Sequence, residues 1–395
     1  PSEEFSSVEG FPLVRIRDLL SEGFETFVTG SVPERVKIRD GDVVIGMDGD
    51  FNLSVWDRGP AALNQRLCLL RPKPGVDIRF VAYSLPPALR IINDLTFSTT
   101  VKHLSSGQIL SERIPLPPLS GQRRIADFLD AEVGLIDRLV AVRRQQIVLL
   151  EERFSIALTD RLVPGMMKKV PRGGRWPWLP RDLSTARLGW YARVQTGVTV
   201  DSSRTPSEAD VEVPYLRVAN VQGGKVDLEE VKSITLPISL ARKSTLRYGD
   251  VVMTEANGNP DNLGRGAVWR NEIEGMIHQN HIFAIRLNQD FILPEYLSFI
   301  LSSVHGRRYF RFTSNQVGIA TTSSSKVLSF PVPKVPVSMQ RIVVDECEKL
   351  LNLHTESTLA LNRQIELLEE RKRALITAAV TGQIDVTTAR GADLS

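Results

Sequence analysis

The chain has few cysteines and no long apolar run. Only two cysteines, Cys68 and Cys347, occur among its 395 residues, and they occupy unrelated positions. This usage argues against a disulfide framework and predicts a reducing compartment, the cytoplasm. No apolar run approaches the roughly 18 residues that a membrane span needs, so we expect no membrane partner. Residues 1–4 are polar and acidic, unlike a secretory signal peptide, and the missing initial Met suggests processing or a start further upstream.

An excess of charge of one sign is also missing. The chain has 49 Lys and Arg against 46 Asp and Glu, a net charge of +3. Such a balance is only a weak hint of a polyanionic partner. One local excess is in residues 164–181, which contain five basic and no acidic residues. Any affinity for nucleic acid must therefore come from Lys and Arg that cluster in space.

Signatures of catalysis are absent as well. The sequence has no G-x-x-x-x-G-K-[ST] motif, which excludes a nucleotide-driven motor of that type. Asn259-Pro260-Asp261 lacks the aromatic residue of the similar element in amino-methyltransferases and is more simply a turn. His278 and His281 have a spacing that suits a metal pair, but no third ligand is evident. We therefore expect no catalytic residue and no metal site.

What the chain does contain is a long internal repeat. Four segment pairs carry it: 15–19 and 217–221 at a shift of 202, 39–44 and 247–252 at 208, 118–123 and 336–341 at 218, and 146–153 and 364–371 at 218. A repeat of this length predicts two copies of one structural unit, related by an approximate two-fold axis. Function should then reside in something that is used twice.

Each copy is predicted to end in a long helix. Apolar residues recur at steps of three, four or seven, which is typical of a coiled-coil stripe. In the first copy the stripe comprises Ile125, Leu129, Ile136, Val140, Ile147, Leu150, Phe154 and Ala157. In the second copy it comprises Val343, Cys347, Leu350, Leu361, Ile365, Leu368 and Leu375.

Prolines and glycines limit these helices. Prolines at 115–118 and 331–333 mark the starts, and Pro164-Gly165 and Gly382 mark the ends. Each helix is then about 40 residues, or about 60 Å, long. A single such helix would expose its stripe to water, so we expect the two to pair, antiparallel. His354, Ser357 and Thr358 interrupt the second stripe.

The repeat, together with the prolines and glycines that limit the helices, divides the chain into six segments. They are a first globular part over 1–114, a helix over 115–163, a linker over 164–181, a second globular part over 182–330, a helix over 331–382 and a tail over 383–395. Short strands and turns dominate the globular parts, where Gly-Asp leads into β-branched residues. In the linker, Trp176 and Trp178 are expected to hold the chain against a surface.

These features together resemble the specificity subunits of type I restriction-modification enzymes. In the first copy the resemblance is carried by TTVKHLSS at 99–106, IPLPPL at 114–119 with Gln122, DFLD at 127–130 with Ile136-Asp137, and LLEER at 149–153. In the second copy it is carried by PYLRV at 214–218 with Asn220-Val221, GDVVMTE at 249–255, QNH at 279–281, and LLEER at 367–371 continuing to AVTGQID at 379–385. Each motif is weak by itself, but their duplicated order is specific and spans essentially the whole chain.

The resemblance implies an α+β protein with two globular target recognition domains, joined by two long helices that form an antiparallel coiled coil. Each recognition domain would read one half of a bipartite site in double-stranded DNA. The helices would space the domains and dock methyltransferase subunits, and a separate motor–nuclease restriction subunit would complete the complex. The chain itself would perform no chemistry, with S-adenosylmethionine, ATP and Mg bound on the partner subunits.

One departure concerns the first recognition domain. The second copy contains segments at 187–189 and 195–197 that resemble the opening of a family recognition domain. At the shift of 202, Pro1 falls on Ser203, so the first copy has no counterpart for them. Either the sequence begins downstream of the true start, or the first recognition domain is short at its N-terminal side.

Residues that contact DNA can be proposed only from their type and from a loop-like setting. Asn and Gln suit adenine, whereas Arg and Lys suit guanine or phosphate. The candidates are Arg58, Asn64, Gln65, Lys102, His103, Lys168, Lys169, Arg204, Asn257, Asn259, Arg265, Asn315 and Gln316. Gln122 and Gln340 recur at matched helix starts and are predicted to cap the helices instead.

Two other functions remain open at this point. The chain could be a partner-binding coiled-coil scaffold that has lost sequence-specific DNA reading. It could also be a stand-alone methyltransferase or nuclease, which the missing cofactor and motor motifs disfavour.

Overall fold

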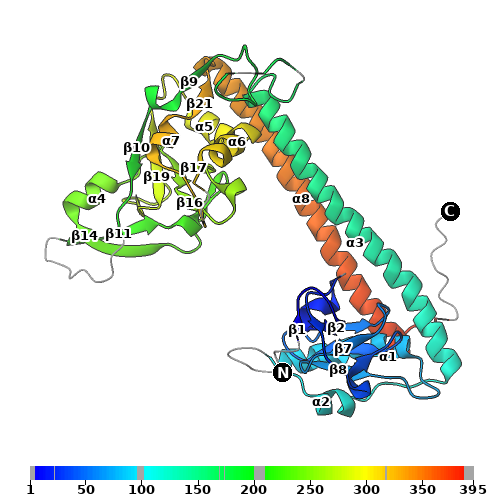
Figure 1. The fold of residues 1–395 in the computed structure, drawn as a ribbon. Helices are drawn as coiled ribbons and strands as arrows, with labels where there is room; N and C mark the ends of the chain where they lie inside the picture. The colour runs from blue at the N-terminus through cyan, green and yellow to red at the C-terminus, as the bar shows by residue number, and fades with distance from the viewer. Residues whose placement is uncertain are drawn as a thin grey trace. The chain divides into compact units, whose positions relative to one another are not determined.

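The structure, a computed structural model (Figure 1), describes residues 5–21, 23–95, 102–168, 170–172, 174–199, 210–315 and 318–386. The chain forms two compact units. Unit 1 comprises residues 1–144 and 361–395, and unit 2 comprises residues 145–360. Two helices run through both units, α3 (Leu119–Leu162) and α8 (Val337–Val380). Each unit therefore combines one globular part with a segment of each long helix.

The globular part of unit 1 contains two small sheets. One has the strand order β1-β3-β2-β7-β4 and the other the order β6-β5-β8. The strands are β1 (Phe5–Ser6), β2 (Phe11–Val14), β3 (Phe27–Val28), β4 (Lys37–Ile38), β5 (Val43–Gly46), β6 (Leu53–Val55), β7 (Ala61–Leu63) and β8 (Leu67–Leu70). Helices α1 (Ile78–Leu95) and α2 (Ser106–Ser111) follow them. The β-branched run at 43–45 is wholly buried, as its composition predicts.

The globular part of unit 2 repeats this plan with additions. Its main sheets have the orders β10-β19-β15-β17 and β14-β11-β18, and three strand pairs (β12-β13, β16-β20 and β21-β9) accompany them. The strands are β9 (Thr185–Arg187), β10 (Ala192–Thr196), β11 (Asp210–Leu216), β12 (Val221–Gln222), β13 (Lys225–Val226), β14 (Lys232–Pro237), β15 (Val251–Thr254), β16 (Ala256–Asn257), β17 (Gly266–Val268), β18 (Ile277–His278), β19 (Ile282–Leu287), β20 (Ala320–Thr321) and β21 (Pro331–Pro333). The helices are α4 (Ile238–Ser244), α5 (Pro294–Ser302), α6 (Val304–Thr313) and α7 (Ser324–Leu328).

The two copies share hydrogen bonds as well as sequence. In unit 1, Asp42 accepts a bond from the Arg39 amide at 2.8 Å, and Arg71 binds both of its carboxylate oxygens at 2.9 and 2.8 Å. In unit 2, Asp250 accepts from the Arg247 amide at 2.8 Å and from Arg286 at 2.9 and 2.7 Å. The predicted repeat is therefore confirmed at the level of individual side-chain contacts.

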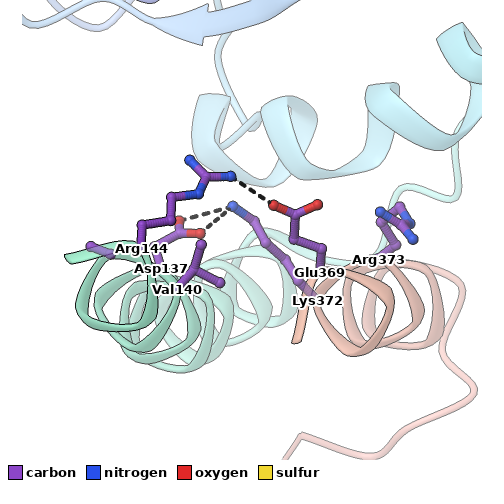
Figure 2. Close-up of a pocket in the computed structure, with 7 residues that line it drawn as sticks. Asp137, Val140, Arg144, Glu369, Lys372 and Arg373 are labelled. Atoms are coloured by element: carbon purple, nitrogen blue, oxygen red, sulfur yellow. Dashed lines mark hydrogen bonds and ion pairs between the residues drawn. The ribbon is translucent and has the colours of Figure 1, made fainter. Parts of the chain in front are cut away.

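Helices α3 and α8 lie antiparallel in unit 1. Lys372 contacts Asp137 at 2.7 and 2.8 Å, and Arg144 contacts Glu369 at 3.0 Å (Figure 2). Residue numbers rise along α3 as they fall along α8, which fixes the opposite directions. The first turns of α3 and the last turns of α8 also bury Leu129, Val133 and Ala379 together with Phe80 of α1. The helix pair and α1 thus share one core.

The same antiparallel pairing holds within unit 2. Phe154 stacks on His354 with ring centroids 4.5 Å apart, and Arg161 lies 3.4 Å from Glu346. Leu158 and Leu162 of α3 join Val344 and Cys347 of α8 in the large core of this unit. His354, which interrupts the second stripe, therefore makes an aromatic contact with Phe154.

The predicted stripes lie on the inner faces of the helices. Leu129, Ile136 and Val140 are buried. Cys347 of the second stripe is also buried. The other predicted stripe residues are half-buried, namely Ile125, Ile147, Leu150, Phe154, Ala157, Val343, Leu350, Leu361, Ile365, Leu368 and Leu375. The antiparallel coiled coil expected from the apolar spacing is confirmed.

The segment between α3 and β9 is held to unit 2 by its tryptophans. Trp178 is buried, and its Nε1–H donates to Nδ1 of His305 at 3.0 Å. Trp176 meets Tyr309 edge-on, with ring centroids 5.0 Å apart. Arg172 donates to the carbonyls of Met166 and Lys168, at 2.8 and 3.2 Å. The guanidinium of Arg172 is therefore directed to its own segment.

Candidate nucleic-acid interface

Three loops meet at one edge of the β6-β5-β8 sheet in unit 1. The Met47 amide donates to the Arg66 carbonyl at 3.0 Å, and the Leu104 amide donates to the Met47 carbonyl at 2.7 Å. The Gly49 amide donates to the Lys102 carbonyl at 3.0 Å. These backbone bonds join the loop after β5, the β7–β8 turn and the segment before α2. We call this set of backbone bonds the three-loop frame.

The frame of unit 1 presents a connected group of polar side chains. Nη1 of Arg66 donates to Asp48 at 2.7 Å, and Nδ1 of His103 lies 2.7 Å from the other oxygen of the same carboxylate. The bond from His103 and the charge of Arg66 lower the pKa of Asp48. Arg66 and His103 are 57% and 55% exposed, so both side chains face solvent. The group can donate hydrogen bonds to an acceptor outside the chain.

Unit 2 contains the same frame. The Glu255 amide donates to the His281 carbonyl at 2.9 Å, and the Thr322 amide donates to the Glu255 carbonyl at 2.9 Å. These bonds match those of Met47 with Arg66 and Leu104, at shifts of 208, 215 and 218. His281 is 55% exposed, and its Nδ1 lies 3.5 Å from Glu255. The two frames thus share a backbone arrangement and differ in the side chains they carry.

Some of the predicted contact residues in unit 1 are engaged by their own chain. Arg58 donates to the carbonyls of Asp18 and Ser21, at 2.8 and 2.6 Å, and stacks over Trp56. Lys102 donates to the backbone and side-chain oxygens of Asn93, at 2.6 and 2.9 Å. These placements favour a structural role for both side chains. Asn64 and Gln65 belong to the β7–β8 turn of the frame, where Gln65 is exposed.

Other predicted contacts gather in unit 2. Strand β16 pairs with β20, and Asn315 bridges to Thr321, so Asn257 and Asn315 lie on connected segments. Asn259 is exposed, while Arg265 is half-buried against Gly223. Lys168 is exposed in the segment after α3. Lys169, Arg204 and Gln316 lie outside the described residues.

Sequence reasoning did not select Arg66, Asp48 or Glu255. A signal was present, because Asn64-Gln65-Arg66 falls on Gln279-Asn280-His281 at a shift of 215. This shift lies between the 208 and 218 found on either side of it. The two segments match in residue class but share no identical residue at matched positions. A comparison based on identical residues therefore misses the pair.

Gln122 and Gln340 do not act as simple helix caps. Oε1 of Gln122 accepts from the Asp77 amide at 2.9 Å, and its Nε2 donates to the carbonyls of Gly75 and Pro117, at 3.2 and 2.8 Å. Gln340 makes the corresponding three bonds with Leu293, Phe291 and Val335. Both side chains are buried. Each glutamine therefore ties the start of a long helix to the loop before a helix of the same unit, α1 in unit 1 and α5 in unit 2.

The described residues contain no cluster of three or more His, Cys, Asp or Glu side chains that could hold a metal ion. The two histidines of the possible pair have different surroundings. His278 is buried, with Nδ1 2.8 Å from the Ile282 carbonyl, whereas His281 faces solvent. Burial lowers the pKa of His278. In the described ranges, no helix combines the length and the apolar character of a membrane span.

Comparison with known proteins identifies the proteins that share these features. A model of the type I restriction modification DNA specificity domain matches residues 2–147. The EcoBI type I specificity subunit of Escherichia coli is 28% identical over 395 residues, which is 97% of this chain and 82% of the relative. The chain is therefore similar to type I specificity subunits over nearly its whole length.

A further relative and a solved structure are similar to this chain over nearly its full length. The EcoKI specificity subunit of Escherichia coli strain K12 is 24% identical, over 94% of this chain and 82% of the relative. A structure described as showing complex assembly and conformational transition of the type I R-M system superposes with a TM-score of 0.71. It covers 95% of this chain and 92% of that chain at 16% identity, which establishes a shared fold.

Proposed function

We propose that the chain is the DNA-specificity subunit of a type I restriction-modification complex and reads a bipartite target with one recognition domain in each unit. The observation that carries this proposal is the three-loop frame, which is built twice with different exposed polar side chains. A domain pair of this kind suits two separated half-sites on one duplex. The family relatives are named as specificity subunits of type I restriction enzymes, which supports the assignment.

The frames have the chemistry that base reading needs. Base edges in the major groove present hydrogen-bond donors and acceptors, and Arg, Asn, Gln and His side chains can pair with them. Phosphate contacts by exposed lysines such as Lys168 would hold the register without specifying sequence. Because the overall charge is nearly balanced, affinity should depend on these local groups.

The helix pair supplies a surface for protein partners. Besides the inner stripe, α3 and α8 carry apolar side chains that are exposed: Leu139, Val142, Val148, Leu149, Ile156, Met339, Ile342, Leu353, Leu359 and Leu367. Apolar side chains gathered on exposed helix faces favour protein–protein contact. We assign the partners as methyltransferase subunits and, through them, a restriction subunit.

The chemistry of the complex would then belong to the partners. S-adenosylmethionine would bind the methyltransferase subunits, and ATP and Mg would bind the motor–nuclease subunit. The chain would act by placing these enzymes on a chosen sequence, in the cytoplasm where the DNA lies. Methyl transfer by the purified chain alone would contradict this division of labour.

The test combines target mapping with duplex binding. Methylome sequencing of a host that carries the complete system should reveal a motif with two specified parts separated by an unspecified gap. Purified chain should then bind a duplex with both half-sites much more tightly than duplexes in which either half is scrambled. Binding should weaken as salt rises, because phosphate contacts release counterions. Equal affinity for intact, half-scrambled and fully scrambled duplexes would instead indicate a scaffold without sequence reading.

A further inference from the structure

The guanidinium of Arg66 is fixed by one hydrogen bond, and its other N–H groups remain available to a ligand. One donor, Nη1, is bound to Asp48, and that carboxylate is also bound by His103. In the described part of the chain, the remaining N–H groups of Arg66 have no hydrogen-bond partner. A guanidinium fixed at one end and open at the other presents parallel donors in a defined direction.

Stability alone does not explain this group. Arg66 and His103 are more than half exposed, and exposed ion pairs contribute little to folding because water screens them. The carboxylate does have a positional effect. It restricts the rotamers of a long side chain that would otherwise lose conformational freedom on contact with a ligand. The arrangement therefore suits recognition better than stabilisation.

The corresponding position in unit 2 is occupied by His281. The matching backbone bonds make Met47 equivalent to Glu255, Arg66 equivalent to His281 and Leu104 equivalent to Thr322. The isolated bridge between Asp48 and His103 corresponds to the pairing of Ala256 with Thr321. The frame of unit 1 carries its carboxylate on Asp48. The frame of unit 2 carries it on Glu255, which is equivalent to Met47 and not to Asp48. The same backbone presents an arginine in one unit and a histidine in the other.

We propose that Arg66, positioned by Asp48 and His103, reads a guanine in one half-site, and that His281 occupies the equivalent reading position for the other half-site. This inference rests on the proposed function. Arginine is the side chain whose two parallel donors match O6 and N7 of guanine. Because the two reading positions carry different side chains, we expect the half-sites to differ at the corresponding base.

The experiment selects bound sequences from a pool of duplexes with a randomised central segment, using the full-length chain. The wild-type chain should select a bipartite motif with a specified guanine in one half. Arg66→Gln should reduce the preference for that guanine by about tenfold or more. Arg66→Lys, which keeps the charge, should also lose discrimination because it lacks the two-pronged contact. The other half-site should remain unchanged in both variants.

Two further variants separate reading from other roles. Asp48→Asn should weaken the guanine preference less than Arg66→Gln, since it loosens the guanidinium without removing it. Arg35→Gln changes an exposed arginine of the same unit outside the frame, and should leave the motif unchanged. An unaltered motif in folded Arg66→Gln, or a uniform loss of affinity with the same base preferences, would overturn the inference.

A transplant tests the equivalence of the two frames. Glu255→Met, Ala256→Asp, His281→Arg and Thr321→His together give unit 2 the side chains of unit 1. The folded variant should specify guanine at the corresponding base of the second half-site, and failure to gain it would refute the equivalence. Selection of no motif by the wild-type chain is a different result, because it would contradict the proposed function itself.

Discussion

Paired polar side chains organise both units at the residue scale. Asp42 and Asp250 are almost fully buried, and each is satisfied by a backbone amide and a two-pronged arginine. A buried carboxylate without such partners would be strongly destabilising. The Gly-Asp turn before β5 and β15 is therefore stabilised by the arginine–aspartate ion pair as well as by the backbone conformation that glycine allows. It directs the following buried strand, and the three-loop frame begins where that strand ends.

The helix-start glutamines are expected to be important for stability. Gln340→Ala removes three hydrogen bonds and leaves the Leu293 amide and two carbonyls without their partner. We expect the free energy of unfolding to fall by about 2–4 kcal/mol. Urea unfolding followed by tryptophan fluorescence measures this change. Gln145→Ala, at an exposed site on α3, should change it by less than about 0.5 kcal/mol. Equal effects of the two substitutions would show that the buried contacts contribute nothing.

His305 should make unit 2 sensitive to acid. Burial lowers its pKa from the usual 6.5 to about 4, and its ring accepts from Trp178 and donates to the Pro331 carbonyl as a neutral imidazole. Between pH 6.5 and 4 the unfolded chain binds a proton that the folded chain excludes. Stability is therefore complete above pH 6.5 and is lost as the pH falls, by about 3 kcal/mol in total.

Thermal unfolding measured from pH 7 to pH 5 checks this expectation. The wild-type midpoint should fall, and His305→Gln should flatten the fall because an amide can accept and donate without titrating. A slope that is the same in both proteins would assign the acid sensitivity to other groups.

At the scale of the element, the helix pair combines an apolar seam with unsatisfied polar atoms. Nδ1 of His354 and Oγ1 of Thr358 are buried and have no hydrogen-bond partner among the described residues. The first helix has Ile136 and Val140 in the corresponding repeat positions, where the seam is buried. The packing of α8 against α3 is therefore less stabilising at His354 and Thr358 than an all-apolar seam would be.

Thr358→Val should strengthen the helix pair. The substitution keeps the shape of the side chain and removes a buried hydroxyl that has no partner, so we expect stabilisation by about 1 kcal/mol. Thr355→Val is the matched control, since Thr355 is exposed and its hydroxyl already donates to the Leu351 carbonyl at 2.9 Å. Urea unfolding of both variants measures the difference. Destabilisation by Thr358→Val would mean that the hydroxyl is satisfied in solution.

At the scale of the whole molecule, both long helices pass from one unit into the other. The unit boundary falls at residues 144–145 of α3 and 360–361 of α8. A bipartite reader must engage both half-sites at once, and simultaneous engagement depends on the length of the connection between the domains. The helical connection should therefore match the gap in the target.

Inserting one heptad into each helix at this boundary tests that expectation. A heptad keeps the apolar seam in phase and adds about 10 Å of helix. Affinity for the wild-type target should fall to that of a duplex with a single half-site, while each half-site alone is bound as before. Unchanged affinity for the full target would show that the helices do not set the gap.

The sequence by itself determined the repeat, the helices and their pairing. Apolar spacing from Ile125 to Phe154 and from Val343 to Leu375 records a local periodicity, and proline placement records where helices cannot continue. Both are properties of neighbouring residues, so they are visible without coordinates. The family resemblance followed for the same reason, since it depends on the order of short motifs.

Only the tertiary structure decided which polar side chains work together. Arg66, Asp48 and His103 lie far apart in the sequence and meet because three loops exchange backbone hydrogen bonds at one sheet edge. Arg58 and Lys102 have the residue types and the setting of DNA contacts, yet the fold directs both to carbonyl groups of the chain. Residue type determines what a side chain can bind, whereas its surroundings determine whether its donors remain available. Those surroundings arise from long-range contacts that no local pattern encodes.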